Sequence, residues 1–222
     1  MEGNTIFRKI TIIEGSTKYD VLNSLKEIYP SSDLSYHDIP NTIIADTYFY
    51  EITQNVNEIL ENVSSLSLEK AYNVWNTRKQ DLPIKNISDM FILASIVEKE
   101  TPIENEKSLV AGVFFNRLKN NMRLQSDPTV EFSITLGKKK LGRALSRNDL
   151  KFQSDYNTYR IHGLPPSPIC FPGVSSLEAV ATPENTKYFY FVADKINGGH
   201  LFSSNYNEHL KNVKKMRMIS DD

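Results

Sequence analysis

Apolar residues in the first third of the chain occur in short stretches that alternate between strand-like and helix-like spacing. Stretches rich in β-branched and aromatic residues favour strands, and apolar residues three or four positions apart favour helices. In chain order, the predicted elements are a strand at 7–13, a helix that Ser16 or Thr17 caps and Pro30 ends, a strand at 42–50, and helices near 52–62 and 67–79. This mixture predicts a small α/β module.

From residue 81 onward the spacing is mainly helical. The strongest boundary candidate is Asp81-Leu82-Pro83, which predicts an N-terminal module at 1–80 and a second domain at 81–222. The elements predicted for the second domain are helices at 88–100 (capped by Ser88), 104–119 and 127–135, an irregular proline-rich loop at 154–173, a hairpin of 188–193 with 200–203, and a helix at about 206–217. The chain as a whole is therefore predicted to have an α+β fold.

Composition and charge exclude some classes of protein. Of the 222 residues, 40% are hydrophobic and 24% are charged, as in an ordinary globular protein. The formal net charge of −1 argues against a nucleic-acid-binding protein, and the single cysteine, Cys170, excludes an internal disulfide. No stretch approaches the ~18 apolar residues of a membrane span, and residues 1–4 do not open a signal peptide. Either the chain works where it is made, or a targeting segment has been removed.

One carboxylate stands out on the predicted helix at 88–100. At ~100° per residue, Glu100 projects to the same side as the apolar residues Ile96 and Val97. Glu98 falls on nearly the opposite side of the same helix. The helix therefore directs one specific carboxylate along its apolar face.

The surroundings expected for Glu100 suit a general acid. Pro102 disfavours helical conformation at Thr101, so the helix is expected to end near Glu100. Apolar neighbours and the negative end of the helix dipole would both raise the pKa of this glutamate. A glutamate that stays protonated near neutral pH can donate a proton to a glycosidic oxygen. The alternative is an ordinary amphipathic helix whose last turn is frayed and solvated.

The start of the predicted helix at 127–135 is the first candidate wall of a sugar-binding cleft. Amide, carboxylate and hydroxyl groups gather there on Gln125, Asp127 and Thr129. Such groups can hydrogen-bond the hydroxyl and amide groups of a sugar. A plain N-cap ahead of Pro128 is the alternative explanation for the same residues.

The proline-rich loop at 154–173 is the second candidate wall. Aromatic rings can stack on sugar faces, and prolines fix such a wall at little entropic cost. The candidate binding residues are Tyr156, Asn157, Thr158 and Tyr159. The alternative is a stiff surface loop that carries two core tyrosines.

The remaining candidates point to no cofactor. His200 and His209 stand alone, as structural histidines usually do, and their spacing does not fit a zinc site. The sequence has no nucleophile elbow, phosphate-binding loop or dinucleotide fingerprint. We therefore predict neither a metal nor a cofactor.

Six segments together resemble the MltG-type (YceG-like) endolytic murein transglycosylases. They follow the family's order within residues 88–210, and six ordered motifs do not arise by chance. The segments are 94–101 (ASIVEKET), 113–118 (VFFNRL), 124–130 (LQSDPTV), 156–159 (YNTY), 163–166 (GLPP) and 190–193 (YFVA). The first third resembles part of the family's LysM-like region.

The resemblance implies a LysM-like module followed by a lysozyme-like catalytic domain with a small β-hairpin. It implies cleavage of the β-1,4 bond between N-acetylmuramic acid and N-acetylglucosamine in peptidoglycan strands. The catalytic residue of the family falls on the second glutamate of the run at 98–101, which is Glu100. Family members are anchored in the bacterial inner membrane by one N-terminal helix, which this chain lacks, with the enzyme on the periplasmic side. They are thought to act beside glycan-polymerising penicillin-binding proteins and to terminate nascent strands.

A lytic mechanism would need only one carboxylate from the protein. Hydrolytic glycosidases usually use two, whereas a lytic transglycosylase uses the C6 hydroxyl of muramic acid as nucleophile and leaves a 1,6-anhydro end. Glu100 is predicted to protonate the leaving oxygen and then to accept the C6 hydroxyl proton. Two alternatives stay open: a hydrolytic muramidase that uses Glu100 and Asp127, and a non-catalytic peptidoglycan-binding or scaffold protein.

Overall fold

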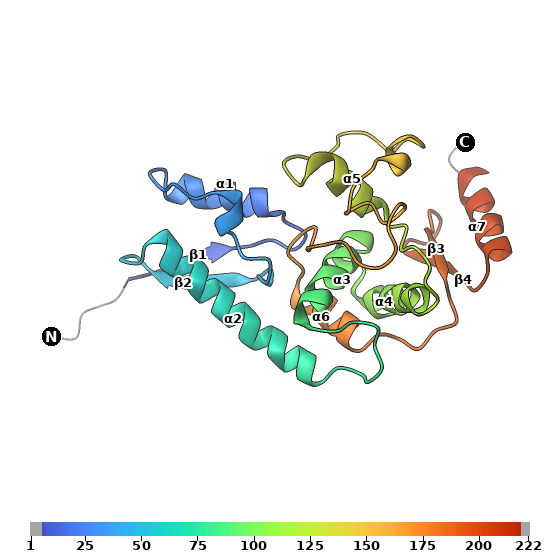
Figure 1. The fold of residues 1–222 in the computed structure, drawn as a ribbon, viewed down its shortest axis with the longest axis horizontal. Helices are drawn as coiled ribbons and strands as arrows, with labels where there is room; N and C mark the ends of the chain where they lie inside the picture. The colour runs from blue at the N-terminus through green and yellow to red at the C-terminus, as the bar shows by residue number, and fades with distance from the viewer. Residues whose placement is uncertain (1–5, 219–222) are drawn as a thin grey trace.

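A computed structural model describes residues 6–218, which form helices and two small antiparallel sheets (Figure 1). Residues 1–4, considered above for a signal peptide, lie outside this range. None of the helices within residues 6–218 combines the length and apolar character needed to cross a membrane. The elements are β1 (Phe7–Thr11), α1 (Lys18–Ile28), η1 (Tyr36–Asp38), β2 (Thr47–Glu51), α2 (Val56–Asn76), α3 (Ile87–Glu100), α4 (Glu104–Lys119), α5 (Asp127–Thr135), η2 (Asp149–Lys151), α6 (Val174–Ala181), β3 (Tyr190–Ala193), β4 (His200–Ser203) and α7 (Tyr206–Met218). The predicted α+β fold is confirmed.

The N-terminal part is built on the antiparallel pair β1 and β2. Ile10 lies opposite Tyr48 in this pair, and both side chains are buried against α1 and α2. Thr17 is the N-cap of α1, where its hydroxyl and the Asp20 carboxylate form a capping box. The predicted strand–helix–strand order of this part is therefore present.

Two predictions for this part are wrong. Of the strand predicted at 42–50, only the part within β2 pairs with another strand. The residues before β2 use their backbone amides in other contacts: the amide of Ile44 donates to Ser67 Oγ, and that of Ala45 donates to the carbonyl of Pro172. The helices predicted near 52–62 and 67–79 are the single helix α2. Polar residues in its middle do not interrupt it, since Ser67 is buried and hydrogen-bonded to Tyr48.

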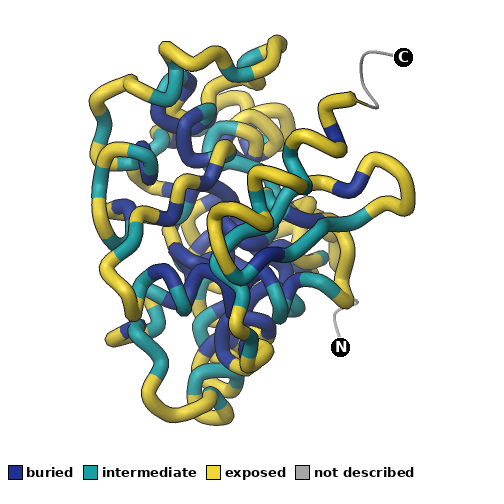
Figure 2. Tube along the Cα trace, turned by 90° about the vertical axis from the view of Figure 1, so that its right-hand side faces the viewer, coloured by how far each residue is buried: buried dark blue, intermediate teal, exposed yellow. Residues whose placement is uncertain are grey.

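Helix α3 is the centre of the second part. Its residues from Met90 to Val97 are all buried, and it packs against α2, α4, α5 and α6. Seen from the side, the buried stretches gather in the middle of the molecule (Figure 2). The helix begins after Asn86 rather than after Ser88, because the Asn86 side chain accepts a hydrogen bond from the amide of Asp89. Helices α4 and α5 have the predicted bounds.

Buried apolar residues form two clusters, one in each part of the chain. Helix α2 contributes to both, with Val63 in the cluster of the N-terminal part and Ala71 in the cluster of the second part. The irregular segment 164–173 also joins them, through Phe171 and Ile169 respectively. The division at residue 80 stays a prediction, because these two segments link the parts by packing as well as by chain connection.

We expect Ser67→Ala to destabilise the protein. It removes the acceptor for the buried Ile44 amide and one partner of the Tyr48 hydroxyl. Leaving a buried donor without a partner costs roughly 1–3 kcal/mol of unfolding free energy. Chemical denaturation measures this loss.

Ser65→Ala is the matched control, because Ser65 lies on the exposed side of the same helix. Alanine has the higher helix propensity, so this variant should be as stable as the parent or slightly more stable. Equal midpoints for the two variants would contradict the role assigned to Ser67.

Candidate active site

The last turn of α3 carries two glutamates, Glu98 and Glu100, whose surroundings differ. Glu98 is held in the interior, where its carboxylate accepts hydrogen bonds from the Gly173 amide (3.0 Å) and the Ser176 hydroxyl (2.7 Å). The buried ammonium of Lys107 lies 3.5 Å from the same carboxylate. Glu98 therefore links α3 to α4 and α6. Of the two glutamates, Glu100 is the one that lines a cavity.

Burial raises the pKa of the Glu100 carboxyl to near neutral pH. The loss of solvent raises its pKa from 4.5 to about 7, and the negative charge of Asp127 acts in the same direction. The hydroxyl of Ser126 and the guanidinium of Arg117 oppose this rise without cancelling it. A carboxyl group with such a pKa can act as a general acid at neutral pH.

A cavity of about 650 Å³ lies in front of Glu100. This volume falls within the range of typical ligand sites. Its walls come from the ends of α3 and α4, the start of α5, the loop before residue 160, the β3–β4 sheet and α7. The lining residues are Glu100, Arg117, Leu124, Gln125, Asp127, Tyr159, Tyr190, Phe191, Val192, Ala193, His200, Tyr206, His209, Val213 and Arg217.

Arg117 fixes two walls of this cavity to each other. Its Nε donates to the carbonyl of Phe189 (2.6 Å), just before β3, and its Nη1 donates to the carbonyl of Leu124 (2.7 Å), just before α5. Its guanidinium also lies over the ring of Tyr190, 5.1 Å from the centroid. Because these carbonyls hold the buried cation, the walls keep a fixed separation.

Three of the predicted binding residues line the cavity. Gln125 adopts a left-handed backbone conformation (φ 50°) before α5 begins, and its side chain is exposed. The hydroxyl of Tyr159 donates to the carboxylate of Asp127 over 2.6 Å. Asp127 thereby has a defined orientation in the same cavity as Glu100.

The other four predicted binding residues do not line the cavity. Thr129, Asn157 and Thr158 are each 0% exposed. Their polar groups serve the chain itself: the Thr158 hydroxyl bonds the Ser126 amide and the Thr129 hydroxyl, and the Asn157 amide bonds the carbonyl of Phe152. Tyr156 packs on Phe132 and bonds Ser167 away from the cavity. These residues support the wall from behind.

The wall opposite the start of α5 comes from the C-terminal part of the chain, which sequence reasoning missed as a binding surface. Tyr190 stacks on His209 with ring centroids 5.2 Å apart, and Tyr206 lies beside both rings. Burial and the nearby Arg117 lower the pKa of His209. Only the motif at 190–193 signalled this wall, and it did not indicate which side chains face the cavity.

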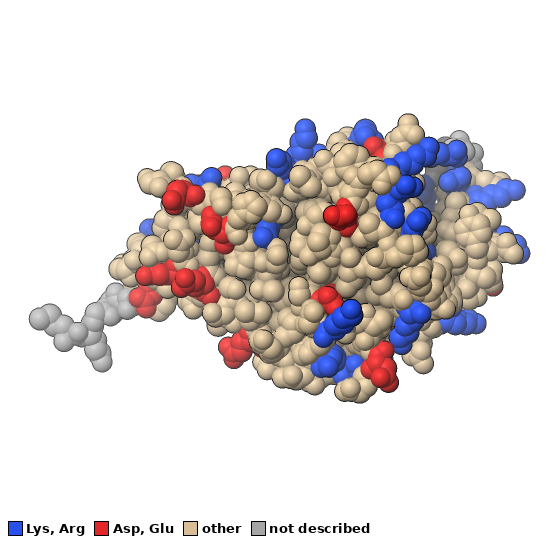
Figure 3. All heavy atoms as spheres, in the orientation of Figure 1, with Lys and Arg blue, Asp and Glu red and all other residues tan. Residues whose placement is uncertain are grey.

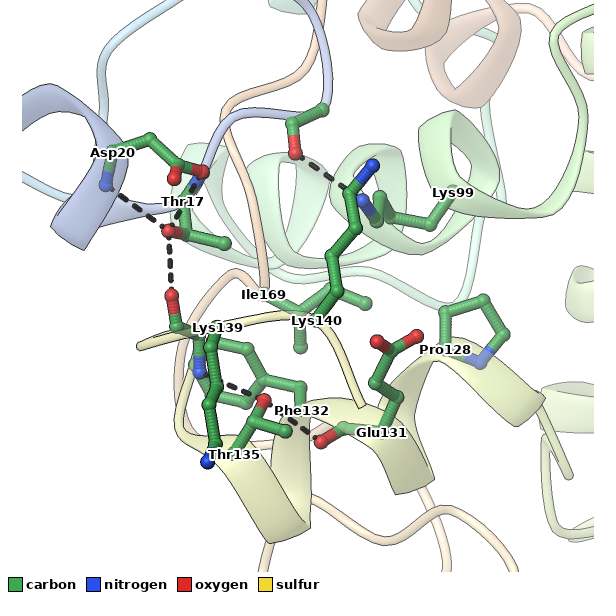
Figure 4. Close-up of a pocket in the computed structure, with 12 residues that line it drawn as sticks. Thr17, Asp20, Lys99, Pro128, Glu131, Phe132, Thr135, Lys139, Lys140 and Ile169 are labelled. Atoms are coloured by element: carbon green, nitrogen blue, oxygen red, sulfur yellow. Dashed lines mark hydrogen bonds between the residues drawn. The ribbon is translucent and has the colours of Figure 1, made fainter. Parts of the chain in front are cut away.

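A second cavity of about 130 Å³ lies between the start of α1 and α5 (Figure 4). It is lined by Lys99 and Pro128, the sequence neighbours of Glu100 and Asp127, so the ends of α3 and α5 separate the two cavities. Its carboxylates accept hydrogen bonds from backbone amides: Asp20 from Thr17 and Glu131 from Leu141. We therefore place the candidate acid chemistry in the larger cavity.

Comparison with known proteins relates the chain to enzymes of the bacterial cell wall. An endolytic murein transglycosylase of Bacillus subtilis is 33% identical over 219 residues, which cover 95% of this chain and 59% of that protein. One of Streptococcus pneumoniae (strain D39) is 33% identical over 132 residues, or 57% of this chain and 23% of that protein. The chain thus spans less than two thirds of these relatives.

The fold also matches a solved structure. A yceG-like protein of Listeria monocytogenes superposes with a TM-score of 0.74 at 26% identity, over 91% of this chain and 75% of that one. The model of the YceG-like family matches residues 1–215. This match extends over almost the entire sequence, and the chain therefore belongs to the YceG-like family.

Proposed function

We propose that this protein is an endolytic peptidoglycan lytic transglycosylase with Glu100 as its acid. The observation that carries the proposal is a carboxyl group with a pKa of about 7 that faces a large cavity. The similarity to endolytic murein transglycosylases of Bacillus and Streptococcus supplies the substrate class. The substrate is the bond between N-acetylmuramic acid and N-acetylglucosamine.

The proposed reaction consumes no water and returns the acid to its starting form. Glu100 donates its proton to the glycosidic oxygen as the bond from that oxygen to C1 of muramic acid breaks. The C6 hydroxyl oxygen of the same sugar then bonds to C1, and its proton passes to the Glu100 carboxylate. Because the nucleophile belongs to the substrate, its effective concentration at C1 is high, and the products are a free N-acetylglucosamine end and a 1,6-anhydromuramic acid end.

Gln125, Asp127 and Tyr159 are the proposed glycan-binding residues of the α5 wall. Gln125 supplies an exposed amide, and the Asp127–Tyr159 pair supplies oriented oxygen atoms. Tyr190 on the opposite wall offers an aromatic ring for stacking on a sugar face. The cavity therefore presents both the polar and the aromatic groups that carbohydrate binding requires.

The charge distribution also suits an anionic polymer. Although the formal net charge is −1, lysine and arginine gather over the end of the molecule that carries α7, and acidic residues over the N-terminal part (Figure 3). Peptidoglycan strands carry carboxylates on lactyl groups and peptides. A positive field near the cavity would favour their approach.

The proposed cellular role follows from family membership. The enzyme would act on the outer side of the bacterial inner membrane, held there by a membrane anchor. Cutting nascent strands beside glycan-polymerising penicillin-binding proteins would terminate their growth. The substrate itself would be the uncrosslinked glycan strand.

A second candidate function is hydrolysis by a muramidase mechanism. The specific observation in its favour is Asp127, a second carboxylate in the same cavity, close enough to Glu100 to raise its pKa. In a hydrolase this group would serve as nucleophile or as base for water. The two functions differ in their products, since hydrolysis leaves a reducing end.

We expect Glu100→Gln to abolish cleavage, because the glutamine amide is too weakly acidic to transfer a proton to the leaving oxygen. Mass spectrometry of digested peptidoglycan should detect anhydromuramyl ends with the parent protein and none with the variant, a loss of at least about a hundredfold as is typical for a general acid. Glu69→Gln, the same change at an exposed position on α2, should leave the products unaltered.

The products also decide between the alternatives. Reducing ends in place of anhydro ends would assign the chain to the hydrolases. Unchanged glycan with the parent protein, together with intact glycan binding, would support a peptidoglycan-binding scaffold instead.

We expect kcat/KM for glycan cleavage to fall as the pH rises through about 7. Glu100 must be protonated to act, and burial raises its pKa from 4.5 to about 7, so the active form is lost only above this value. Asp127→Asn removes a negative charge that raises this pKa, and should move the basic limb to lower pH. The pH profile of kcat/KM measures both effects.

Asp33→Asn is the control for the charge effect, because Asp33 lies exposed in the N-terminal part. It should leave the basic limb in place. A limb near the ordinary glutamate pKa in the parent protein would contradict the assignment of Glu100.

A further inference from the structure

His200 occupies a position that the proposed reaction does not explain. It is the first residue of β4, and its side chain, 12% exposed, lines the cavity that Glu100 faces. Its sequence position suggested only a structural histidine. The contacts of its ring indicate a more specific use.

Glu106 of α4 holds both the backbone and the ring of His200. One carboxylate oxygen accepts from the His200 amide (2.9 Å), and the other contacts Nδ1 of the ring (2.7 Å). A carboxylate can only accept, so the proton of a neutral His200 lies on Nδ1. Nε2 then carries a lone pair, which makes it a hydrogen-bond acceptor.

Two aromatic side chains fix the plane of the imidazole. Phe191 meets it edge to face at 5.3 Å, and Phe202 lies 6.2 Å from it. Within residues 6–218, Nε2 forms no hydrogen bond, although Nδ1 and the backbone amide both do. The ring is therefore held on one edge, and its acceptor edge has no partner within the described chain.

The same glutamate connects this wall to the catalytic helix. The hydroxyl of Thr101, the residue after Glu100, donates to Glu106 over 3.4 Å, and it also accepts from the amide of Ile103. The turn that ends α3 and the start of β4 are thus tied to one carboxylate. This arrangement sets the position of the His200 ring relative to the acid.

From this geometry we propose that His200 binds the glycan directly, with Nε2 accepting a hydrogen bond from a sugar hydroxyl or acetamido N–H. Glu106 is a positioning residue that fixes the tautomer and the orientation of the ring. The inference rests on the proposed function, because it takes peptidoglycan glycan as the ligand of the cavity. It adds a specific substrate contact on the β3–β4 wall, opposite the residues at the start of α5.

Binding without cleavage tests this inference separately from catalysis. We would measure the affinity of peptide-free N-acetylglucosaminyl–N-acetylmuramyl strands for the Glu100→Gln protein, alone and with His200→Phe. Phenylalanine keeps an aromatic ring against Phe191 and removes both nitrogens. We expect about five- to tenfold weaker binding, as for the loss of one hydrogen bond.

Two further variants separate contact from support. His200→Gln keeps a group that can accept a hydrogen bond and should recover part of the affinity. Glu106→Gln should weaken binding less than His200→Phe, because the ring stays but its tautomer is no longer fixed. His37→Phe, at an exposed histidine of η1, should bind like the parent.

A measurement on the unmutated ring covers the case in which His200→Phe does not fold. In ¹⁵N-labelled Glu100→Gln protein, adding the same strands should shift the Nε2 resonance of His200 and leave that of His37 in place. An unshifted resonance while the strands bind, or a folded His200→Phe variant with unchanged affinity, would overturn the inference. If the parent binds strands without producing anhydro ends, the proposed reaction fails while the His200 contact can still be judged.

Discussion

The enclosure of α3 is the constraint on which the rest of the structure depends. Eight consecutive residues, from Met90 to Val97, are buried, so the helix cannot lie on a surface and must be surrounded by other elements. Each fully buried large apolar side chain contributes about 1.5–3 kcal/mol. Ionising Glu100 with a pKa of about 7 instead of 4.5 costs roughly 3 kcal/mol, which one or two such residues offset. The same packing therefore stabilises the fold and desolvates the acid.

Local surroundings give the two glutamates at the end of this helix different roles. Glu98 meets a buried lysine, a backbone amide and a serine hydroxyl, and its charge is balanced inside the protein. Glu100 is desolvated by burial and lies near the negative charge of Asp127, while the Ser126 hydroxyl and the Arg117 guanidinium act in the opposite direction on its pKa. Glu98 therefore links α3 to its neighbouring helices, whereas the carboxyl of Glu100 faces the cavity.

The cavity exists because distant segments are held against each other. Arg117 and its neighbour Asn116 bind the carbonyls of residues 186, 188 and 189, and so attach the C-terminal sheet to α4. Glu106 attaches the start of β4 to the same helix. Helix α4 thus carries one wall, while the start of α5 and the segment at 157–159 form the other. Neither wall alone would enclose a glycan.

The sequence by itself determined the elements whose signals are local. Helical spacing and Pro102 were enough to end the acid-bearing helix at Glu100, and α4 and α5 followed from their own apolar patterns. Residues 43–45 were misassigned to a strand because they are apolar, as the residues of a buried strand are. The backbone amides of Ile44 and Ala45 instead bind α2 and the segment at 172.

Only the tertiary structure decided which polar residues reach the cavity. Asn157 and Thr158 were chosen for their chemistry, yet they face inward because the chain uses their groups to satisfy its own backbone. His200 was passed over because its partner, Glu106, is 94 residues away. A residue's type and its neighbours in sequence fix what it can bond. Whether that bond goes to the protein or to a ligand depends on contacts between distant segments, which form only when the chain is folded.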